Sequence, residues 1–234
     1  MKFCAIVVAA GRGVRFGRSK QTIEVGGRPL AAWSIATFGE MPELEYLVIA
    51  TEPEHVADFE AIARRFAPRL RARVVTGGAS RQKSARNALA AVPDQCDAVF
   101  VHDGARPLVS AADIRTGMSV VAPRVGAVLA APVVDTIKVV PRGTRRVVRT
   151  LERSELWAAQ TPQFATVADL REAHAAAERD GVEATDDVGL LERLGMDVVI
   201  VPASGENFKV TLPGDLERAE AVLRARERET IPTR

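Results

Sequence analysis

AIVVAAGRGVRFGRSK, residues 5–20, is the stretch that decides the fold of this chain. Ile6, Val7 and Val8 are β-branched and lie in a short apolar run bounded by glycine, which predicts a strand at residues 5–10 because the run is too short for a helix. The glycines that follow allow the backbone to approach an anion closely, with N–H groups pointing inward. The stretch therefore predicts a first strand that ends in a phosphate-binding loop.

The loop carries more positive charge than a backbone cradle needs, at Arg12, Arg15, Arg18 and Lys20, which indicates a highly anionic ligand. The alternative is a tight turn whose arginines are solvated. A dinucleotide-binding GxGxxG loop would have glycine where Phe16 stands, and the lysine-containing loop of triphosphate-binding proteins does not fit either. Both common nucleotide loops are therefore disfavoured.

Strand-like apolar runs recur and alternate in the first half of the chain with helical patterns. The predicted strands are residues 5–10, 46–50, 73–75, 98–101, 127–131 and 198–201, and the predicted helices are residues 29–38, 56–66, 80–91 and 215–228. This alternation predicts an α/β fold, a Rossmann-like, mostly parallel twisted sheet flanked by helices. Ligands of such sheets bind beyond the carboxyl ends of the strands, where the loops 11–20, 76–82 and 102–107 are expected to converge.

With 234 residues and 47% hydrophobic content, the chain is predicted to form one domain, residues 1–234. The segment at about 134–156 interrupts the alternation and reads as a β-hairpin rich in arginine, too polar to be buried. We expect it to be a projecting arm that packs on a second subunit and makes a homodimer. A solvated surface hairpin is the alternative.

Composition and cysteine spacing exclude several classes of protein. A net charge of +2 and an aromatic content of 5% disfavour nucleic-acid binding. Cys4 and Cys96 are far apart and lack CxxC or Cys/His spacing, which predicts buried free thiols in a reducing compartment and no zinc or disulfide framework. Since no apolar segment approaches the roughly 18 residues that span a bilayer, we expect a cytoplasmic protein without membrane contact.

Asp103 follows a buried strand and is flanked by Gly104 and Arg106. A carboxylate at a sheet edge beside a phosphate loop suits Mg²⁺ or another divalent cation, which prefers one or two carboxylates together with phosphate oxygens. A helix N-cap or an ion pair with Arg106 remains the alternative. We interpret His102 as a residue that packs beside this carboxylate rather than as a base.

A second polar cluster lies downstream. It comprises Asp135, Thr136, Lys138, Arg153, Gln160, Thr161, Pro162, Gln163, Thr185, Asp186, Asn207 and Lys209. Lys209 lies between Phe208 and Val210 in a strand-like segment, where a lysine needs a partner, either Asp186 or a phosphate. An exposed strand face is the alternative.

Several motifs occur in order along nearly the whole chain. They are AAGRGVR at residues 9–15, KQ at 20–21, GGASRQKSARNAL at 77–89, VHDGARP at 101–107, APVVDTIK at 131–138, LW at 156–157, QTPQF at 160–164, TDD at 185–187, NFKVT at 207–211 and PGDL at 213–216. In these motifs the chain resembles the 2-C-methyl-D-erythritol 4-phosphate cytidylyltransferases, enzymes of the non-mevalonate isoprenoid pathway that couple CTP to a sugar-alcohol phosphate.

The resemblance implies a role for each matching residue. For CTP it implies binding by Ala10, Gly11, Gly13, Gly77, Gly78, Ser84 and Ala105, and for the metal it implies Asp103. It implies catalytic roles, through stabilisation of charge, for Arg15, Lys20 and Lys209. For the acceptor it implies Arg106, Asp135, Thr136, Arg153, Thr161 and Thr185, with the arm residues reaching in from the partner subunit.

The mechanism that the resemblance implies follows from charge. The acceptor is a phosphate monoester with a second pKa of about 6, so at neutral pH it is already a dianionic nucleophile that needs no general base. Repulsion between this dianion and the triphosphate limits the reaction. In-line positioning, with Mg²⁺, Arg15, Lys20 and Lys209 around the transferring group, would overcome it.

The chain departs from the family pattern at Ser19, Thr22 and Gly104, where the family usually has proline, an aromatic residue and alanine, and we expect these changes to affect rate or affinity. A ribitol 5-phosphate cytidylyltransferase would share the fold, the CTP loop and the arm, but the AAG opening and the APVVDTIK segment favour methylerythritol phosphate. A nucleotide-binding oxidoreductase or a noncatalytic nucleotide sensor is the alternative from another class.

We predict that Lys20→Ala lowers turnover at least about 100-fold with little loss of stability, because one preorganised charge donor contributes that much to transition-state stabilisation. Steady-state kinetics and thermal melting of the purified variant measure both effects. Arg18→Ala is the matched control, since Arg18 needs no catalytic role. Near-normal turnover of Lys20→Ala would remove the role assigned to this lysine.

Overall fold

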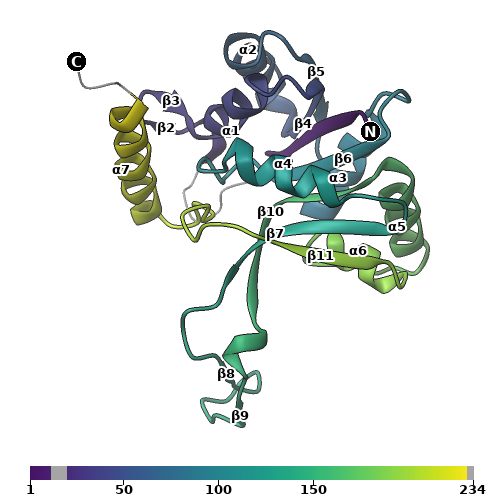
Figure 1. Ribbon diagram of the computed structural model, residues 1–234, viewed down its shortest axis with the longest axis vertical. Helices are drawn as coiled ribbons and strands as arrows, with labels where there is room; N and C mark the ends of the chain where they lie inside the picture. The colour runs from purple at the N-terminus through teal and green to yellow at the C-terminus, as the bar shows by residue number, and fades with distance from the viewer. Residues whose placement is uncertain (12–19, 231–234) are drawn as a thin grey trace.

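A seven-stranded sheet forms the centre of the computed structural model, which describes residues 1–11 and 20–230 (Figure 1). Across the sheet the order is β11 (Asp197–Pro202), β7 (Val125–Pro132), β10 (Trp157–Thr166), β6 (Ala98–Asp103), β1 (Phe3–Val8), β4 (Leu44–Thr51) and β5 (Arg71–Thr76). Neighbouring strands pair in parallel except at β10, which is antiparallel to both β6 and β7. The predicted α/β fold with a mostly parallel sheet is confirmed.

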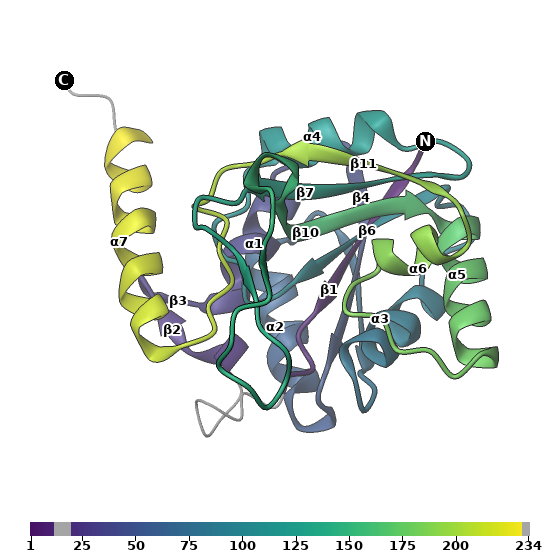
Figure 2. The ribbon, with the colours of Figure 1, turned by 90° about the horizontal axis from the view of Figure 1, so that it is seen from below.

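Helices cover both faces of the sheet (Figure 2). One face packs against α1 (Leu30–Gly39), α2 (Val56–Phe66) and α4 (Ala111–Val120), and the other against α3 (Arg81–Ala90), α5 (Val167–Arg179) and α6 (Val188–Arg193). In β1, Ala5 and Val7 join the first core cluster, whereas Cys4 and Ile6 join the second. The period-two alternation of a strand thus buries this apolar run on both faces.

Strand β10 was not predicted, because Gln160, Thr161 and Gln163 make its sequence polar where a buried strand is expected to be apolar. These side chains can be buried because each is hydrogen-bonded: Gln160 donates to the Ser204 carbonyl, and Thr161 and Gln163 accept from backbone N–H groups. Because β10 is antiparallel to β6 and pairs Gln163 with Val101, its preceding residues reach the edge where β6 ends. Helices α4, α5 and α6 were also absent from the predicted pattern.

Residues 133–156 leave the sheet between β7 and β10 and project from the body as an arm (Figure 1). In the arm, β8 (Lys138–Val139) pairs antiparallel with β9 (Arg149–Thr150), and the short η3 helix (Arg153–Glu155) leads back to the sheet. Gly143 has a φ of 80°, which glycine adopts readily in the connecting turn. The predicted hairpin is present, and its contact with a second subunit stays a prediction.

The C-terminal helix α7 (Pro213–Thr230) packs beside the small hairpin of β2 (Glu24–Val25) and β3 (Arg28–Pro29). A third apolar cluster joins Val25, Leu223, Ala105 and Val210. The segment before α7, residues 207–211, is irregular rather than strand-like, and its Val210 N–H donates to the Ala105 carbonyl at 2.8 Å. Two further short helices are η1 (Lys20–Thr22) and η2 (Pro53–His55).

Within the described ranges, no helix is both long enough and apolar enough to cross a membrane.

Candidate functional site

Described residues that follow β1, β4 and β5 line an open cavity of about 560 Å³ at the carboxyl edge of the sheet. Its lining includes Ala10, Gly11, Thr51 and the β5–α3 loop, which we define as residues 77–80. The Ala9 N–H donates to the Ala50 carbonyl, and the Gly77 N–H donates to the Thr51 carbonyl. The cavity has the size of a small-ligand site. Gly11 and residues 77–80, which line it, belong to two of the loops that were predicted to converge.

Two glycines are required where the β5–α3 loop turns. A Cβ on Gly77 would lie 2.2 Å from the Cβ of Ala10, and one on Gly78 would lie 2.4 Å from the Cβ of Lys83. Ser84 is fully buried behind the loop, where its hydroxyl accepts from the Gly78 N–H at 3.0 Å and donates to the Ser80 carbonyl at 2.8 Å. Ser84 therefore fixes the shape of the loop.

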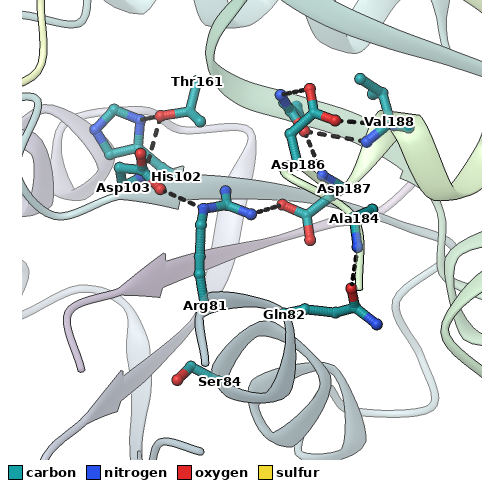
Figure 3. Close-up of polar contacts among 12 residues, drawn as sticks. Arg81, Gln82, Ser84, His102, Asp103, Thr161, Ala184, Asp186, Asp187 and Val188 are labelled. Atoms are coloured by element: carbon teal, nitrogen blue, oxygen red, sulfur yellow. Dashed lines mark hydrogen bonds and ion pairs between the residues drawn. The ribbon is translucent and has the colours of Figure 1, made fainter. Parts of the chain in front are cut away.

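The carboxylate of Asp103, at the end of β6, is buried among cations. Its Oδ1 accepts from Arg81 Nε at 2.8 Å and its Oδ2 from Lys209 Nζ at 2.7 Å, while Arg106 Nε lies 4.0 Å from Oδ2 (Figure 3 shows the Arg81 contact). Burial by itself would raise the pKa of Asp103, but attraction to Arg81 and Lys209 outweighs burial and holds the pKa far below its usual range. Asp103 is therefore ionised at neutral pH.

Asp103 is the carboxylate at this edge of the sheet that could bind a divalent metal. Among the residues that the structure describes, no three His, Cys, Asp or Glu side chains gather as a ready-made metal site. A single carboxylate fits a magnesium ion that takes most of its ligands from phosphate oxygens and water. Asp103 thus suits a metal that arrives with an anionic ligand, and does not suit one held by protein alone.

Lys209 reaches this carboxylate from the irregular segment 207–211, not from a strand. Of the two partners considered for Lys209, Asp186 is ruled out, because Lys209 bonds Asp103. Asp186 accepts instead from Gln163 Nε2 and from the Gly189 N–H. Of the two alternatives for Asp103, the N-cap does not occur, whereas the ion pair with Arg106 does, at 4.0 Å, although Arg81 and Lys209 lie closer. Arg106 also donates through Nη1 to the Asn207 carbonyl at 2.7 Å.

A chain of hydrogen bonds fixes His102 as a neutral ring. The Asp103 N–H donates to Thr161 Oγ1 at 3.0 Å, and Thr161 Oγ1 lies 3.2 Å from His102 Nδ1. His102 Nε2 lies 3.0 Å from the Arg106 carbonyl, so Nε2 carries the proton and Nδ1 accepts from the threonine hydroxyl. Burial lowers the pKa of His102 to about 4. His102 packs beneath the site, as expected, and is not free to act as a base.

Arg81 and Asp187, for which no role was predicted, form a buried ion pair. Arg81 Nη1 donates to Asp187 Oδ2 at 2.7 Å, and the side chain of Asp187 is only 3% exposed (Figure 3). Burial would raise the pKa of Asp187, yet Arg81 and His174 keep it lowered. Arg81 belongs to the motif at residues 77–89 and Asp187 to the motif at residues 185–187. Nothing in the sequence indicates that these two positions, 106 residues apart, form a pair.

The structure brings only part of the predicted site together. Ala105, Arg106 and Thr161 lie near Asp103, and Thr185 is exposed on the loop next to Asp187. Asp135, Thr136 and Arg153 lie instead in the projecting arm, where Arg153 Nη1 donates to the Val134 carbonyl. Gly13 and Arg15 lie outside the described residues, together with Ser19, and for Lys20 the description is limited to the backbone at the start of η1.

A family described as 2-C-methyl-D-erythritol 4-phosphate cytidylyltransferase matches residues 3–225. Among curated proteins of that name, the chain is 39% identical to one from Halalkalibacterium halodurans over 230 residues, which covers 97% of this chain and 100% of the relative. It is 40% identical to one from Prochlorococcus marinus, with 94% of this chain and 98% of the relative covered.

Solved structures agree with these relatives. The 2-C-methyl-D-erythritol 4-phosphate cytidylyltransferase of Thermus thermophilus is similar with a TM-score of 0.75 and 34% identity, covering 96% of this chain and all of that one. The 4-diphosphocytidyl-2C-methyl-D-erythritol synthase of Anaerococcus prevotii has a TM-score of 0.82 and 25% identity, covering 95% and 96%.

We predict that His102→Gln flattens the acid dependence of stability. In the unfolded chain the pKa of His102 is about 6.5, whereas in the folded protein burial lowers it to about 4. As the pH falls between these values, only the unfolded chain binds the proton, so the wild type loses stability. Between pH 7 and pH 5 the free energy of unfolding of the wild type should fall by about 2 kcal/mol more than that of the variant. Urea titrations at both pH values measure the difference, and parallel pH dependences would contradict it.

Proposed function

Because the chain belongs to the 2-C-methyl-D-erythritol 4-phosphate cytidylyltransferase family, we propose that the edge of the sheet around Asp103 is where CMP passes from CTP to 2-C-methyl-D-erythritol 4-phosphate. The chain is a CTP-dependent cytidylyltransferase, and methylerythritol phosphate is its acceptor. The resemblance identified from the motifs is thereby confirmed. The family membership disfavours both the ribitol 5-phosphate cytidylyltransferase and the nucleotide-binding oxidoreductase that were kept as alternatives.

The observation that carries the assignment of the site is the positive charge around Asp103, because Arg81, Arg106 and Lys209 all lie within 4.0 Å of its carboxylate. In the described part of the chain, Arg106 Nε lies 4.0 Å from Asp103 Oδ2 and is buried without a hydrogen-bond partner. Buried donors without partners are unfavourable unless a ligand supplies acceptors. Phosphate oxygens are such acceptors, and a dianionic acceptor phosphate needs positive charge around it rather than a base.

On the nucleotide side we assign the triphosphate to Ala10, Gly11, Gly13, Arg15 and Lys20, where Arg15 and Lys20 stabilise the charge that develops during transfer. We assign the base and ribose to the cavity beside Gly77 and Gly78, with Ser84 shaping the loop. Ala105 packs instead in the apolar cluster with Val210, outside the lining of this cavity, so its contact with CTP rests on the resemblance alone. Support comes from the size of the cavity and from the close approach that excludes any larger residue at Gly77 and Gly78.

Asp103 is the residue that we assign to Mg²⁺ or another divalent cation. When bound, the cation supplies positive charge to phosphate oxygens. Lys209, which holds Asp103 Oδ2 at 2.7 Å, is 39% exposed and would turn toward the transferring phosphate when that oxygen is taken. The protein's own contribution is thus to keep one ionised carboxylate in place at the sheet edge.

For the acceptor we assign Arg106, Thr161 and Thr185 within the chain, and Asp135, Thr136 and Arg153 from the arm of a partner subunit. Thr161 would act through the position of Asp103, because its hydroxyl is buried and bonded to the Asp103 N–H. A homodimer is supported by the apolar side chains that the arm and its base expose. They are Val134, Val140, Val147, Val148 and Trp157.

We assign residues 1–234 to one nucleotidyltransferase domain with its arm at about 134–156, located in the cytoplasm. The free, buried thiols of Cys4 and Cys96 support a reducing compartment.

The acceptor assay tests the reaction directly. We expect CTP with Mg²⁺ and 2-C-methyl-D-erythritol 4-phosphate to release pyrophosphate, and ribitol 5-phosphate to react far more slowly. Chelation of the metal with EDTA should abolish the release, and excess Mg²⁺ should restore it. Pyrophosphate release with ribitol 5-phosphate alone would contradict the assignment of the acceptor.

Mixing two inactive variants tests the arm. Arg153→Ala damages the arm, and Lys209→Ala damages the body. If each site combines the body of one subunit with the arm of the other, a mixed dimer has one intact site, so an equal mixture should recover about a quarter of wild-type activity after subunit exchange. Each variant mixed with itself is the control. Absence of recovery, with exchange verified by differently tagged subunits, would contradict an arm that reaches into the partner.

A further inference from the structure

Arg81 occupies a position between the two halves of the site. It is the first residue of α3 and directly follows the β5–α3 loop that borders the nucleotide cavity. Its guanidinium spans the gap between Asp103 at the end of β6 and Asp187, with Nε bonded to the former and Nη1 to the latter (Figure 3). One side chain thus joins the nucleotide side of the site to the segment that carries Thr185.

The neighbouring Gln82 is hydrogen-bonded to the same segment. We define this segment, residues 180–187, as the α5–α6 loop. Gln82 Oε1 accepts from the Ala184 N–H at 2.8 Å, and Gln82 Nε2 donates to the Val182 carbonyl at 3.1 Å. The first turn of α3 therefore holds the loop on both sides of Thr185. Because the β5–α3 loop and α3 are continuous, a shift of the nucleotide loop displaces these anchors directly.

A further anchor of the α5–α6 loop comes from Gln163 of β10. Gln163 Oε1 accepts from the N–H groups of Asp187 and Val188, and its Nε2 donates to Asp186. Gln163 is fixed in the central sheet, so it holds the end of the loop regardless of the nucleotide. The anchors that can respond to a ligand in the cavity are those from Arg81 and Gln82.

We propose that Arg81 is a positioning residue that couples the two substrates, so that filling the nucleotide cavity sets the α5–α6 loop, and with it Thr185, for the acceptor. This inference rests on the proposed function. Lysine cannot replace arginine here, because a single ammonium group cannot bond both Asp103 and Asp187 in the fork geometry that Nε and Nη1 provide. A buried ion pair that served stability alone would affect both substrates equally.

The test compares Arg81→Lys with Arg86→Lys, a control in the same helix whose arginine pairs with Glu178 at the surface. We expect Arg81→Lys to lower kcat/KM for the acceptor at least about 10-fold while KM for CTP changes less than about threefold. The second readout is calorimetric binding of the acceptor with and without a CTP analogue that carries a methylene group between the α- and β-phosphates. The analogue should strengthen acceptor binding at least about fivefold in the wild type and in Arg86→Lys, and not in Arg81→Lys.

Asp187→Asn keeps the shape of the other partner and removes its charge, so it tests the bridge if Arg81→Lys fails to fold. Asp187→Asn should also lower kcat/KM for the acceptor. The double variant should lose no more of this kcat/KM than Arg81→Lys alone, because both changes break the same bridge. An unchanged acceptor kcat/KM in a folded variant, an equal loss for CTP and acceptor, or retained strengthening by the analogue would overturn the proposal. A wild type that fails to use methylerythritol phosphate would instead refute the function.

Discussion

A buried carboxylate must be compensated by positive charge, and this requirement at Asp103 organises the rest of the site. An uncompensated carboxylate in the interior is strongly unfavourable, and each partner that it gains has to be brought to the end of β6 by the fold. Arg81 arrives from the start of α3, and Lys209 arrives from the segment before α7. Segments far apart in the sequence are therefore held at one place by the electrostatic demand of one side chain.

Strands formed by one continuous apolar run, and the loops that follow them, were predictable from the sequence. β1 shows why, since Ile6, Val7 and Val8 combine strand propensity with a glycine stop, and the observed strand, Phe3–Val8, begins two residues before the predicted run. Strand β10 shows the limit. Its Gln160, Thr161 and Gln163 are buried only because partners elsewhere in the fold satisfy their polar groups, and such partners are invisible in a local pattern.

The site divides in the same way. The loop after β5 and the carboxylate after β6 could be placed at one sheet edge, because the carboxyl ends of parallel strands meet there. The environment of Asp103 could not be predicted, because Arg81 lay in the expected loop 76–82 without a predicted partner, and Lys209 was expected in a strand. The roles of these cations depend on distances between residues that only the folded chain defines.

The arm grows from the interior of the sheet, because β7 and β10 are neighbours there and neither is an edge strand. Its base is the pairing of Trp157 with Pro132, and only two residues separate Trp157 from Gln160, the start of the stretch that supports Asp103 and Asn207. The base of the arm therefore lies next to the residues that surround Asp103. In the proposed dimer, a contact at the far end of the arm would therefore act on the two central strands that lead directly to the residues around Asp103.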